Sequence, residues 1–256
     1  MTPRIDGATE LVEPPSSGRL FSTSRKVRLG DVTPKGRLRL DSLSRYLQDV
    51  ANDDSRDADI PDAMWWILRR TRIVVSEPCA FDETVELTTW CSGTGSRWAE
   101  RRTMAVGSNG GRVDAVAIWV AINSETGAPR RVDDGFGALY GEAAGGRRVR
   151  ARSLHGDPDG EETSTPWPIR YTDLDLIGHV NNAIYWCAVE ESMASQRTGG
   201  RVVAEIEFRA GIDAHTQPVL LERATSDGQN FGWFVIDEAV VASYLWSATD
   251  GNSSER

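Results

Sequence analysis

The chain has few cysteines, few histidines and a deficit of basic residues. Its 256 residues include three cysteines and three histidines, and 38 acidic residues stand against 29 basic ones, a formal net charge of −9. This balance argues against a nucleic-acid-binding protein, which needs surplus Lys and Arg to neutralise phosphates. The cysteines form no C-x-x-C pair, and neither they nor the histidines have the spacing of a metal site. We expect a cytoplasmic protein with no metal and no cofactor.

Long hydrophobic segments are also missing. The longest uncharged apolar run, residues 115–122, is too short to cross a bilayer. Residues 1–18 contain no apolar core of a secretory signal. The sequence has no G-x-S-x-G elbow, no Walker loop, no H-E-x-x-H and no dinucleotide-binding glycine pattern. We therefore expect no membrane span and none of the hydrolase or nucleotide sites that these motifs mark.

What the sequence does contain is an internal repeat. Residues 27–40 and 169–182 align without a gap at an offset of 142 (169 − 27). Each copy leads into a predicted helix. In the first helix, leucine and valine recur at helical spacing between residues 40 and 51, which gives one apolar face. In the second, residues 183–189 are apolar all round, as in a helix buried on every side. The chain therefore consists of two similar halves.

Strands are predicted after each helix, because these segments are rich in β-branched and aromatic residues. A run of antiparallel strands forms a sheet with one face to cover, and the preceding helix can cover it. We therefore expect an α+β protein with two such units in tandem. The expected strands are 71–76, 84–90, 98–106 and 113–122 in the first half, and 202–209, 219–224, 231–236 and 239–246 in the second.

The predicted boundaries place residues 20–135 in an N-terminal half and residues 165–247 in a C-terminal half. Residues 136–164 between them are poor in apolar residues and rich in Gly, Arg, Asp and Glu, which is typical of a solvated linker. A phosphate-binding patch of arginines in this linker is the less favoured alternative. The ends, residues 1–19 and 248–256, are expected to be disordered.

One stretch of the second copy has the residues of a catalytic site. Residues 171–182 read Y-T-D-L-D-L-I-G-H-V-N-N, just before the second helix. Unpaired N–H groups at a helix N-terminus stabilise an oxyanion. Asp175 can act there as general base or nucleophile, and His179, with an ordinary pKa near ~6.5, can hold water or pass a proton. We predict attack on an acyl carbonyl held by the amides near His179 and Val180, with Gly178 allowing close approach.

The two asparagines and the first aspartate of this stretch also have structural explanations. Asn181 and Asn182 can position a substrate, or they can cap the helix, since Asn is a preferred N-cap residue. Asp173 can be an ordinary turn residue that bonds to its own backbone. We expect Asp173 to lie outside the chemistry.

The repeat singles out Asp175 and His179. Their counterparts in the first copy are Thr33 and Arg37, so the turn itself needs neither an acid nor an imidazole. We therefore expect chemistry in the second copy only.

The stretch Y-T-D-L-D-L-I-G-H-V-N-N-A-I-Y resembles the segment that precedes the central helix in hotdog-fold acyl thioesterases. The first half adds V-R-L-G-D-V-T-P-K-G at 27–36 and W-W-I-L-R-R-T-R-I at 65–73. With these motifs the chain is similar to the acyl-acyl carrier protein thioesterases, which are fused double hotdogs. The resemblance covers about residues 20–247. It implies a tandem hotdog, a fatty acyl thioester substrate, acyl carrier protein as partner, and Asp175 and His179 in the catalytic positions.

The chain departs from that family at three positions. The family has an active-site Asn where this chain has Ile177, and a Glu and a Cys where it has Gly211 and Ile212. Single-domain hotdog thioesterases tolerate an apolar residue at the first position and rely mainly on the aspartate, so the resemblance implies a reduced but working site. The groups that can compensate are Asp213, His215 and, on the helix of the first half, Gln48.

Two other functions stay open. The three departures favour an acyl-thioester-binding hotdog protein without hydrolysis. An enoyl-thioester hydratase also uses an Asp and a His, but its pair is usually one residue further apart. Hydrolysis is predicted ahead of both. The acyl chain length, the choice between carrier protein and coenzyme A, and the choice between a monomeric pseudo-dimer and a homodimer do not follow from the residues.

Overall fold

The computed structural model describes residues 11–60, 64–123, 125–195 and 201–249. The N-terminal half contributes β1 (Phe21–Lys26), η1 (Leu29–Asp31), α1 (Leu40–Asp57), β2 (Met64–Glu77), β3 (Thr84–Thr94), β4 (Trp98–Gly107), β5 (Arg112–Asn123) and α2 (Asp134–Tyr140). The C-terminal half contributes β6 (Thr163–Pro166), η2 (Tyr171–Asp173), α3 (Tyr185–Ser195), β7 (Arg201–Phe208), β8 (Val219–Ala224), β9 (Gln229–Ile236) and β10 (Ala239–Thr249). All eight predicted strands are present.

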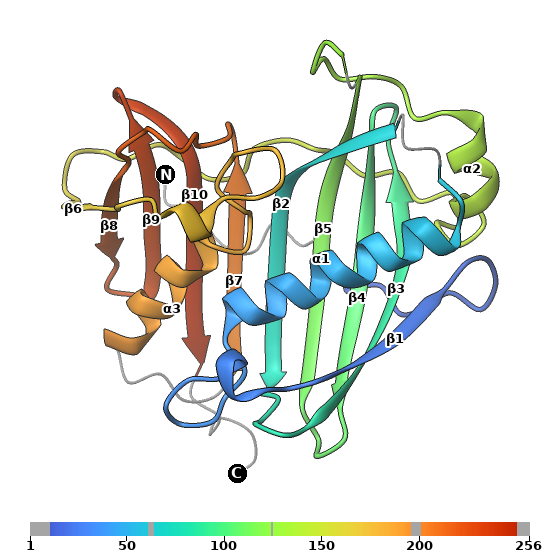
Figure 1. Ribbon diagram of the computed structural model, residues 1–256, viewed down its shortest axis with the longest axis horizontal. Coiled ribbons are helices and arrows are strands. Elements are labelled where there is room, and N and C mark those ends of the chain that lie inside the picture. The colour runs from blue at the N-terminus through green and yellow to red at the C-terminus, as the bar shows by residue number, and fades with distance from the viewer. Residues whose placement is uncertain (1–10, 61–63, 124, 196–200, 250–256) are drawn as a thin grey trace.

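The strands form one antiparallel sheet in the order β1-β3-β4-β5-β2-β7-β10-β9-β8-β6 (Figure 1). Read from either edge, the order is the same for the two halves, which meet where β2 pairs with β7. Strand β6 begins 142 residues after β1 (163 − 21), at the offset of the sequence repeat. The α+β fold with two similar units in tandem is confirmed.

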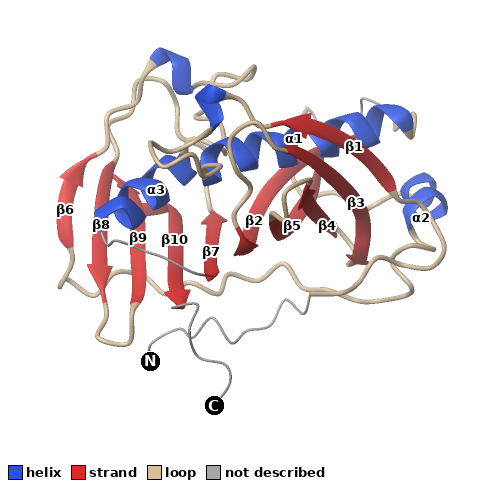
Figure 2. Ribbon diagram, turned by 90° about the horizontal axis from the view of Figure 1, so that it is seen from below, coloured by secondary structure: helices blue, strands red, loops and turns tan. Residues whose placement is uncertain are grey.

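Helices α1 and α3 lie on the same face of the sheet and pack against each other (Figure 2). Helix α1 buries one stripe, which includes Leu43 and Val50, as its amphipathic pattern predicts. Helix α3 is apolar on most sides because it is more deeply covered, and Trp186 and Val189 have no exposed surface. These side chains belong to a single core that continues through both halves. No described helix has the length and apolar character needed to cross a membrane.

The segment predicted as a solvated linker crosses the outer face of the sheet, opposite the helices (Figure 2). It is only partly solvated. The predicted boundary at residue 136 falls inside α2, whose Phe136 and Tyr140 are buried. Further along, the Arg147 guanidinium lies 2.5 Å from the carboxylate of buried Glu100. The reason is that outer-face acids on the strands need donors, and the crossing segment supplies them.

The predicted disordered ends are shorter than expected. Residues 1–10 and 250–256 lie outside the described residues. Residues 11–19 and 248–249 are part of the fold, contrary to the prediction. Arg19 Nε donates to the buried carboxylate of Asp54 at 2.7 Å, and β10 continues to Thr249, which pairs with Arg201.

Candidate active site

Both copies of the repeat fold into the same turn. In each, a short 3-10 helix is followed by a β-bridge, Val32–Leu38 in the first and Leu174–Val180 in the second. Inside the bridges, Gly36 has φ +79° and Gly178 has φ +81°. A Cβ at Gly178 would meet no described atom within 4 Å. The left-handed backbone by itself therefore explains the glycine at position 178.

Asp175 lies in this turn and is half-buried. Its Oδ1 accepts the N–H groups of Ile177 at 3.0 Å and His179 at 3.2 Å. Its Oδ2 has no hydrogen-bond partner among the described residues. In the other half the Thr33 hydroxyl takes the equivalent place and accepts the N–H of Arg37 at 3.3 Å. A carboxylate with one anchored and one unpaired oxygen is suited to take a proton from water.

The amides that the sequence predicted as oxyanion donors are occupied. The N–H of His179 donates to Asp175, and that of Val180 donates to the carbonyl of Ile212 at 2.8 Å. Both bonds maintain the turn and its attachment to the segment after β7. Neither amide is therefore free in this structure for the carbonyl oxygen that the sequence predicted it to hold.

The free amide lies two residues further on. Asn181 N–H donates to the carbonyl of Asp173 at 2.8 Å, and Ala183 N–H donates to Asn181 Oδ1 at 2.9 Å, so Asn181 acts as a cap. Between them, Asn182 N–H has no partner among the described residues. Because α3 starts at residue 185, this amide lies where the helix dipole is positive. It is the group available to a ligand oxygen.

His179 is held at the side of the turn by two features of the segment after β7. Its Nε2 lies 3.1 Å from Asp213 Oδ1, and both side chains remain accessible to solvent. A Cβ built on Gly211 would lie 3.0 Å from the His179 ring, so glycine leaves room for the imidazole. The structure thus brings Asp213 to the site, whereas the exposed His215 has no described contact with it.

Two neighbours of Asp175, the acidic Asp173 and the aromatic Tyr185, have structural roles. Asp173 Oδ2 accepts the N–H of Arg170 at 2.8 Å, as Asp31 does for Arg28 in the other half. Tyr185 is buried, and burial, followed by the charge of Asp175, raises the pKa of its phenol. Tyr185 therefore stays protonated beside the site.

The corresponding position of the N-terminal half is filled by an ion pair. Glu190, on α3, reaches across to the start of α1 and accepts the N–H of Leu40 through Oε1 at 2.6 Å. The same carboxylate binds the Arg37 guanidinium at 3.0 and 2.5 Å. Leu40 is the counterpart of Asn182 at the offset of 142. The helix amide that is free in one half is therefore covered by a carboxylate in the other.

An apolar cavity of about 210 Å³ lies in the N-terminal half, between α1 and the inner face of the sheet. A smaller cavity adjoins it under α1 and extends to Leu47 and Ser44, with Gln48 and Trp119 lining both. Such walls suit an aliphatic ligand. The lining of the larger cavity includes Gln48, Ala51, Ile60, Trp66, Trp119 and Phe136.

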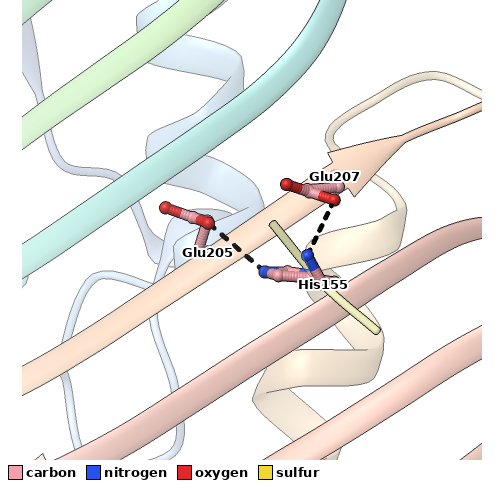
Figure 3. A group of neighbouring side chains, drawn as sticks. All are labelled: His155, Glu205 and Glu207. Carbon is pink, nitrogen blue, oxygen red and sulfur yellow. Dashed lines mark hydrogen bonds and ion pairs between the residues drawn. The ribbon is translucent and has the colours of Figure 1, made fainter. Parts of the chain in front are cut away.

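A second cluster of titratable side chains lies on the outer face, where the crossing segment meets β7. The possible ligand atoms of His155, Glu205 and Glu207 lie within 4.8 Å of one another (Figure 3). His155 Nε2 is 3.3 Å from Glu205 Oε1, and the Arg70 guanidinium lies 4.0 and 3.8 Å from the two carboxylates. These residue types ligate metals, but Arg70 already supplies the positive charge that the acids require.

This outer cluster fastens the crossing segment to the sheet. Glu207 accepts hydrogen bonds from Ser153 Oγ at 2.5 Å, Leu154 N at 2.6 Å and His155 N at 3.2 Å. Sequence reasoning does not connect these residues, since His155 is fifty residues from Glu205. The one available signal is a pair of acids at alternate positions of a strand, which places both on one face.

Comparison with known proteins agrees with this geometry. The family model of the acyl-ACP thioesterase N-terminal domain matches residues 18–140, and that of the C-terminal domain matches residues 156–215. The chain belongs to the acyl-ACP thioesterase family. Its members are thiolester hydrolases, and the predicted recognition and enzyme class are confirmed.

Two curated relatives are similar over most of the thioesterase. An uncharacterised protein of Mycobacterium tuberculosis is 32% identical over 92% of this chain and 94% of its own. The chloroplastic palmitoyl-acyl carrier protein thioesterase of Gossypium hirsutum is 23% identical over 66% of this chain, and the match spans 46% of that protein.

Solved structures share the double-hotdog fold of the thioesterase. The 12:0-ACP thioesterase of Umbellularia californica has a TM-score of 0.75 and 18% identity, covering 90% of this chain and 98% of that one. An acyl-ACP thioesterase of Bacteroides thetaiotaomicron has a TM-score of 0.73 and 16% identity, with the same coverage. At these identities the likeness establishes the fold, in agreement with the sequence repeat.

The cysteines of this thioesterase are poor nucleophiles. Burial, followed by the negative charge of Asp41, raises the pKa of Cys187 to about 11, and burial raises that of Cys91 to about 11. Burial and then Glu83 raise the pKa of Cys79 to about 12. At neutral pH these thiols stay protonated, so they cannot supply the thiolate that nucleophilic catalysis requires.

Proposed function

We propose that this thioesterase hydrolyses fatty acyl thioesters of acyl carrier protein to free fatty acid, with Asp175 as general base. Two groups in the segment that leads into α3 carry the proposal. One is the Asp175 oxygen that accepts no hydrogen bond from the described residues, and the other is the Asn182 N–H that donates none to them. A base and an oxyanion donor are the two groups that water needs to attack a thioester carbonyl.

The chemistry follows from these two groups. Asp175 Oδ2 takes a proton from a water molecule, whose oxygen attacks the carbonyl carbon. The carbonyl oxygen becomes an oxyanion that accepts the N–H of Asn182. Collapse of the tetrahedral intermediate breaks the carbon–sulfur bond, and the leaving thiolate takes up the proton from Asp175. His179 holds the water, with its ring oriented by Asp213. Direct attack by Asp175 on the carbonyl is the variant of the same site.

The apolar cavity of the N-terminal half is suited to bind the aliphatic acyl chain of the substrate. Its walls are mostly apolar, and together with the smaller cavity it follows α1 from Ser44 to Ser55. Carrier protein as the partner rests on family membership alone. The cytoplasmic location and the oligomeric state, a monomeric pseudo-dimer or a homodimer, stay predictions.

A non-catalytic acyl-thioester-binding protein is the second candidate, and Ile177, Gly211 and Ile212 favour it, because they replace polar positions of the family pattern. The test is a panel of acyl chains from about eight to eighteen carbons on carrier protein and on coenzyme A, with a thiol-trapping reagent. Faster thiol release from the carrier-protein series supports the proposal. Preference for coenzyme A would refute the choice of partner, and tight binding without thiol release would favour the second candidate.

A further inference from the structure

The two central helices are in register with the sequence repeat. At the offset of 142, Leu43 corresponds to Tyr185, and both are buried; Asp49 corresponds to Glu191, and both are exposed. The correspondence established in the turns therefore continues along the helices. At the same offset Gln48 of α1 corresponds to Glu190 of α3.

Glu190 shows what a side chain at this helix position reaches. From the second turn of its own helix it extends across the junction of the halves to the start of the other helix. There it contacts the first helix amide, Leu40 N–H, and the Arg37 side chain in the turn before it. The carboxylate oxygen on Leu40 N–H occupies the place that corresponds, in the proposed function, to the substrate oxygen at Asn182.

The same relation viewed from the other half leads to Gln48. Helices α1 and α3 pack against each other, and Cys187 of α3 lies near enough to Asp41 and Arg45 of α1 for their charges to act on its thiol. By the pseudo-twofold relation, the contact of Glu190 with Leu40 N–H predicts a matching approach of the Gln48 side chain to Asn182 N–H. Gln48 also lines the apolar cavity.

We propose that Gln48 is the contribution of the N-terminal half to the active site, a positioning residue that donates its amide N–H to the thioester carbonyl oxygen beside Asn182 N–H. The inference rests on the proposed function. Because glutamine is neutral, it leaves the helix amide open to the substrate. Glutamate at the same helix position closes the other half: Glu190 is held there by Leu40 N–H and Arg37, so each chain has a single working site.

The decisive variant is Gln48→Glu, which gives the C-terminal site the carboxylate that closes the other one. We expect the new carboxylate to accept Asn182 N–H and to compete with the carbonyl oxygen. Loss of an oxyanion donor typically lowers kcat by about 100- to 1,000-fold. Gln48→Ala removes one hydrogen bond without adding a competitor, and we expect about tenfold lower kcat/KM. The matched control is Asp49→Ala on the adjacent exposed position, with activity unchanged.

A pH profile separates this role from a purely structural one. Protonation neutralises the introduced carboxylate, so the rate of Gln48→Glu divided by that of the native protein should rise as the pH falls toward the ordinary glutamate pKa near ~4.3. Using the ratio cancels the titration of Asp175, His179 and Asp213, which both proteins share. A ratio that does not change with pH, or Gln48→Glu activity within about twofold of native at about pH 7.5, would overturn the proposal.

Palmitate binding, followed by tryptophan fluorescence, keeps the test independent of hydrolysis. Trp66 and Trp119 line the cavity and report its occupation. If the native protein binds palmitate but releases no thiol, the proposed function fails. The role of Gln48 is then supported by binding about tenfold weaker in Gln48→Glu, since two carboxylates would compete for one amide, and it is refuted by equal binding. Failure of the native protein to bind any free fatty acid of about eight to eighteen carbons would refute both.

Discussion

Replacing Asp175 with asparagine separates the chemistry of the turn from its folding. In Asp175→Asn the side-chain oxygen can still accept the N–H groups of Ile177 and His179, so the turn keeps both hydrogen bonds. The unpaired Oδ2 becomes an amide nitrogen that cannot take a proton from water. Loss of a positioned general base lowers the rate by about 100- to 10,000-fold, or about 3–5 kcal/mol in activation free energy.

The expected change in stability is small, and the other half of the chain explains why. Thr33 occupies the equivalent position with one hydroxyl and a single hydrogen bond to Arg37, so the turn forms without an acid. We expect the Tm of Asp175→Asn to stay within about 3 °C of native, which for a chain of this size corresponds to about 1 kcal/mol.

The assay is thiol release from a long-chain acyl carrier protein thioester, with calorimetry on the same samples. Asp173→Asn is the matched control, since Asp173 caps its own turn and should leave the rate within about threefold. His179→Ala should give an intermediate loss, because the imidazole is removed while the helix amide remains. Native rates in Asp175→Asn would refute the general-base mechanism, and a large Tm loss would refute the assignment of this residue to chemistry.

Three further outcomes follow from the structure. Iodoacetamide at about pH 7.5 should leave the thioesterase active, because burial raises the pKa of Cys187 to about 11; rapid inactivation would point to a thiolate in the mechanism. Arg37→Ala leaves the mostly buried Glu190 without its guanidinium, and urea denaturation should show a loss of about 3 kcal/mol with kcat nearly unchanged; an unaltered midpoint would contradict the closed second site. Glu207→Ala removes the acceptor for three donors of the crossing segment, so trypsin should cut within residues 147–152 sooner than in the native protein, and identical digestion would show that Glu207 does not fasten it.

The repeat makes the architecture predictable from the residues. The ungapped offset places two turns, two helices and two sets of strands in order. The content of β-branched and aromatic residues locates most long strands within a few positions, although β2 begins seven residues before its predicted start (71 − 64). A strand is expected before the helix of each half, but the residues of β1 and β6 are not predicted. Their Ser- and Thr-rich segments, Phe21–Lys26 and Thr163–Pro166, bury at most one face and have little apolar alternation.

The candidate site is predictable in its residue types but not in its hydrogen bonds. Asp175 and His179 stand out because their counterparts differ while the turn is the same. Which amide is free depends on acceptors distant in sequence, above all the Ile212 carbonyl on Val180. Asp213 can lie near His179 because Gly211 leaves room for the imidazole. In the sequence alone, Gly211 indicates only that a residue of the family pattern is absent.

Product analysis in H₂¹⁸O tests the central claim, hydrolysis of an acyl thioester by water. The native protein would be incubated for many turnovers with an unsaturated enoyl and a saturated acyl thioester of carrier protein, and the products identified by mass spectrometry. The account predicts free fatty acid carrying one ¹⁸O in its carboxyl group, with an equal amount of released thiol. Intact thioester bound to the protein, or a hydroxyacyl thioester formed from the enoyl substrate without thiol release, would contradict it.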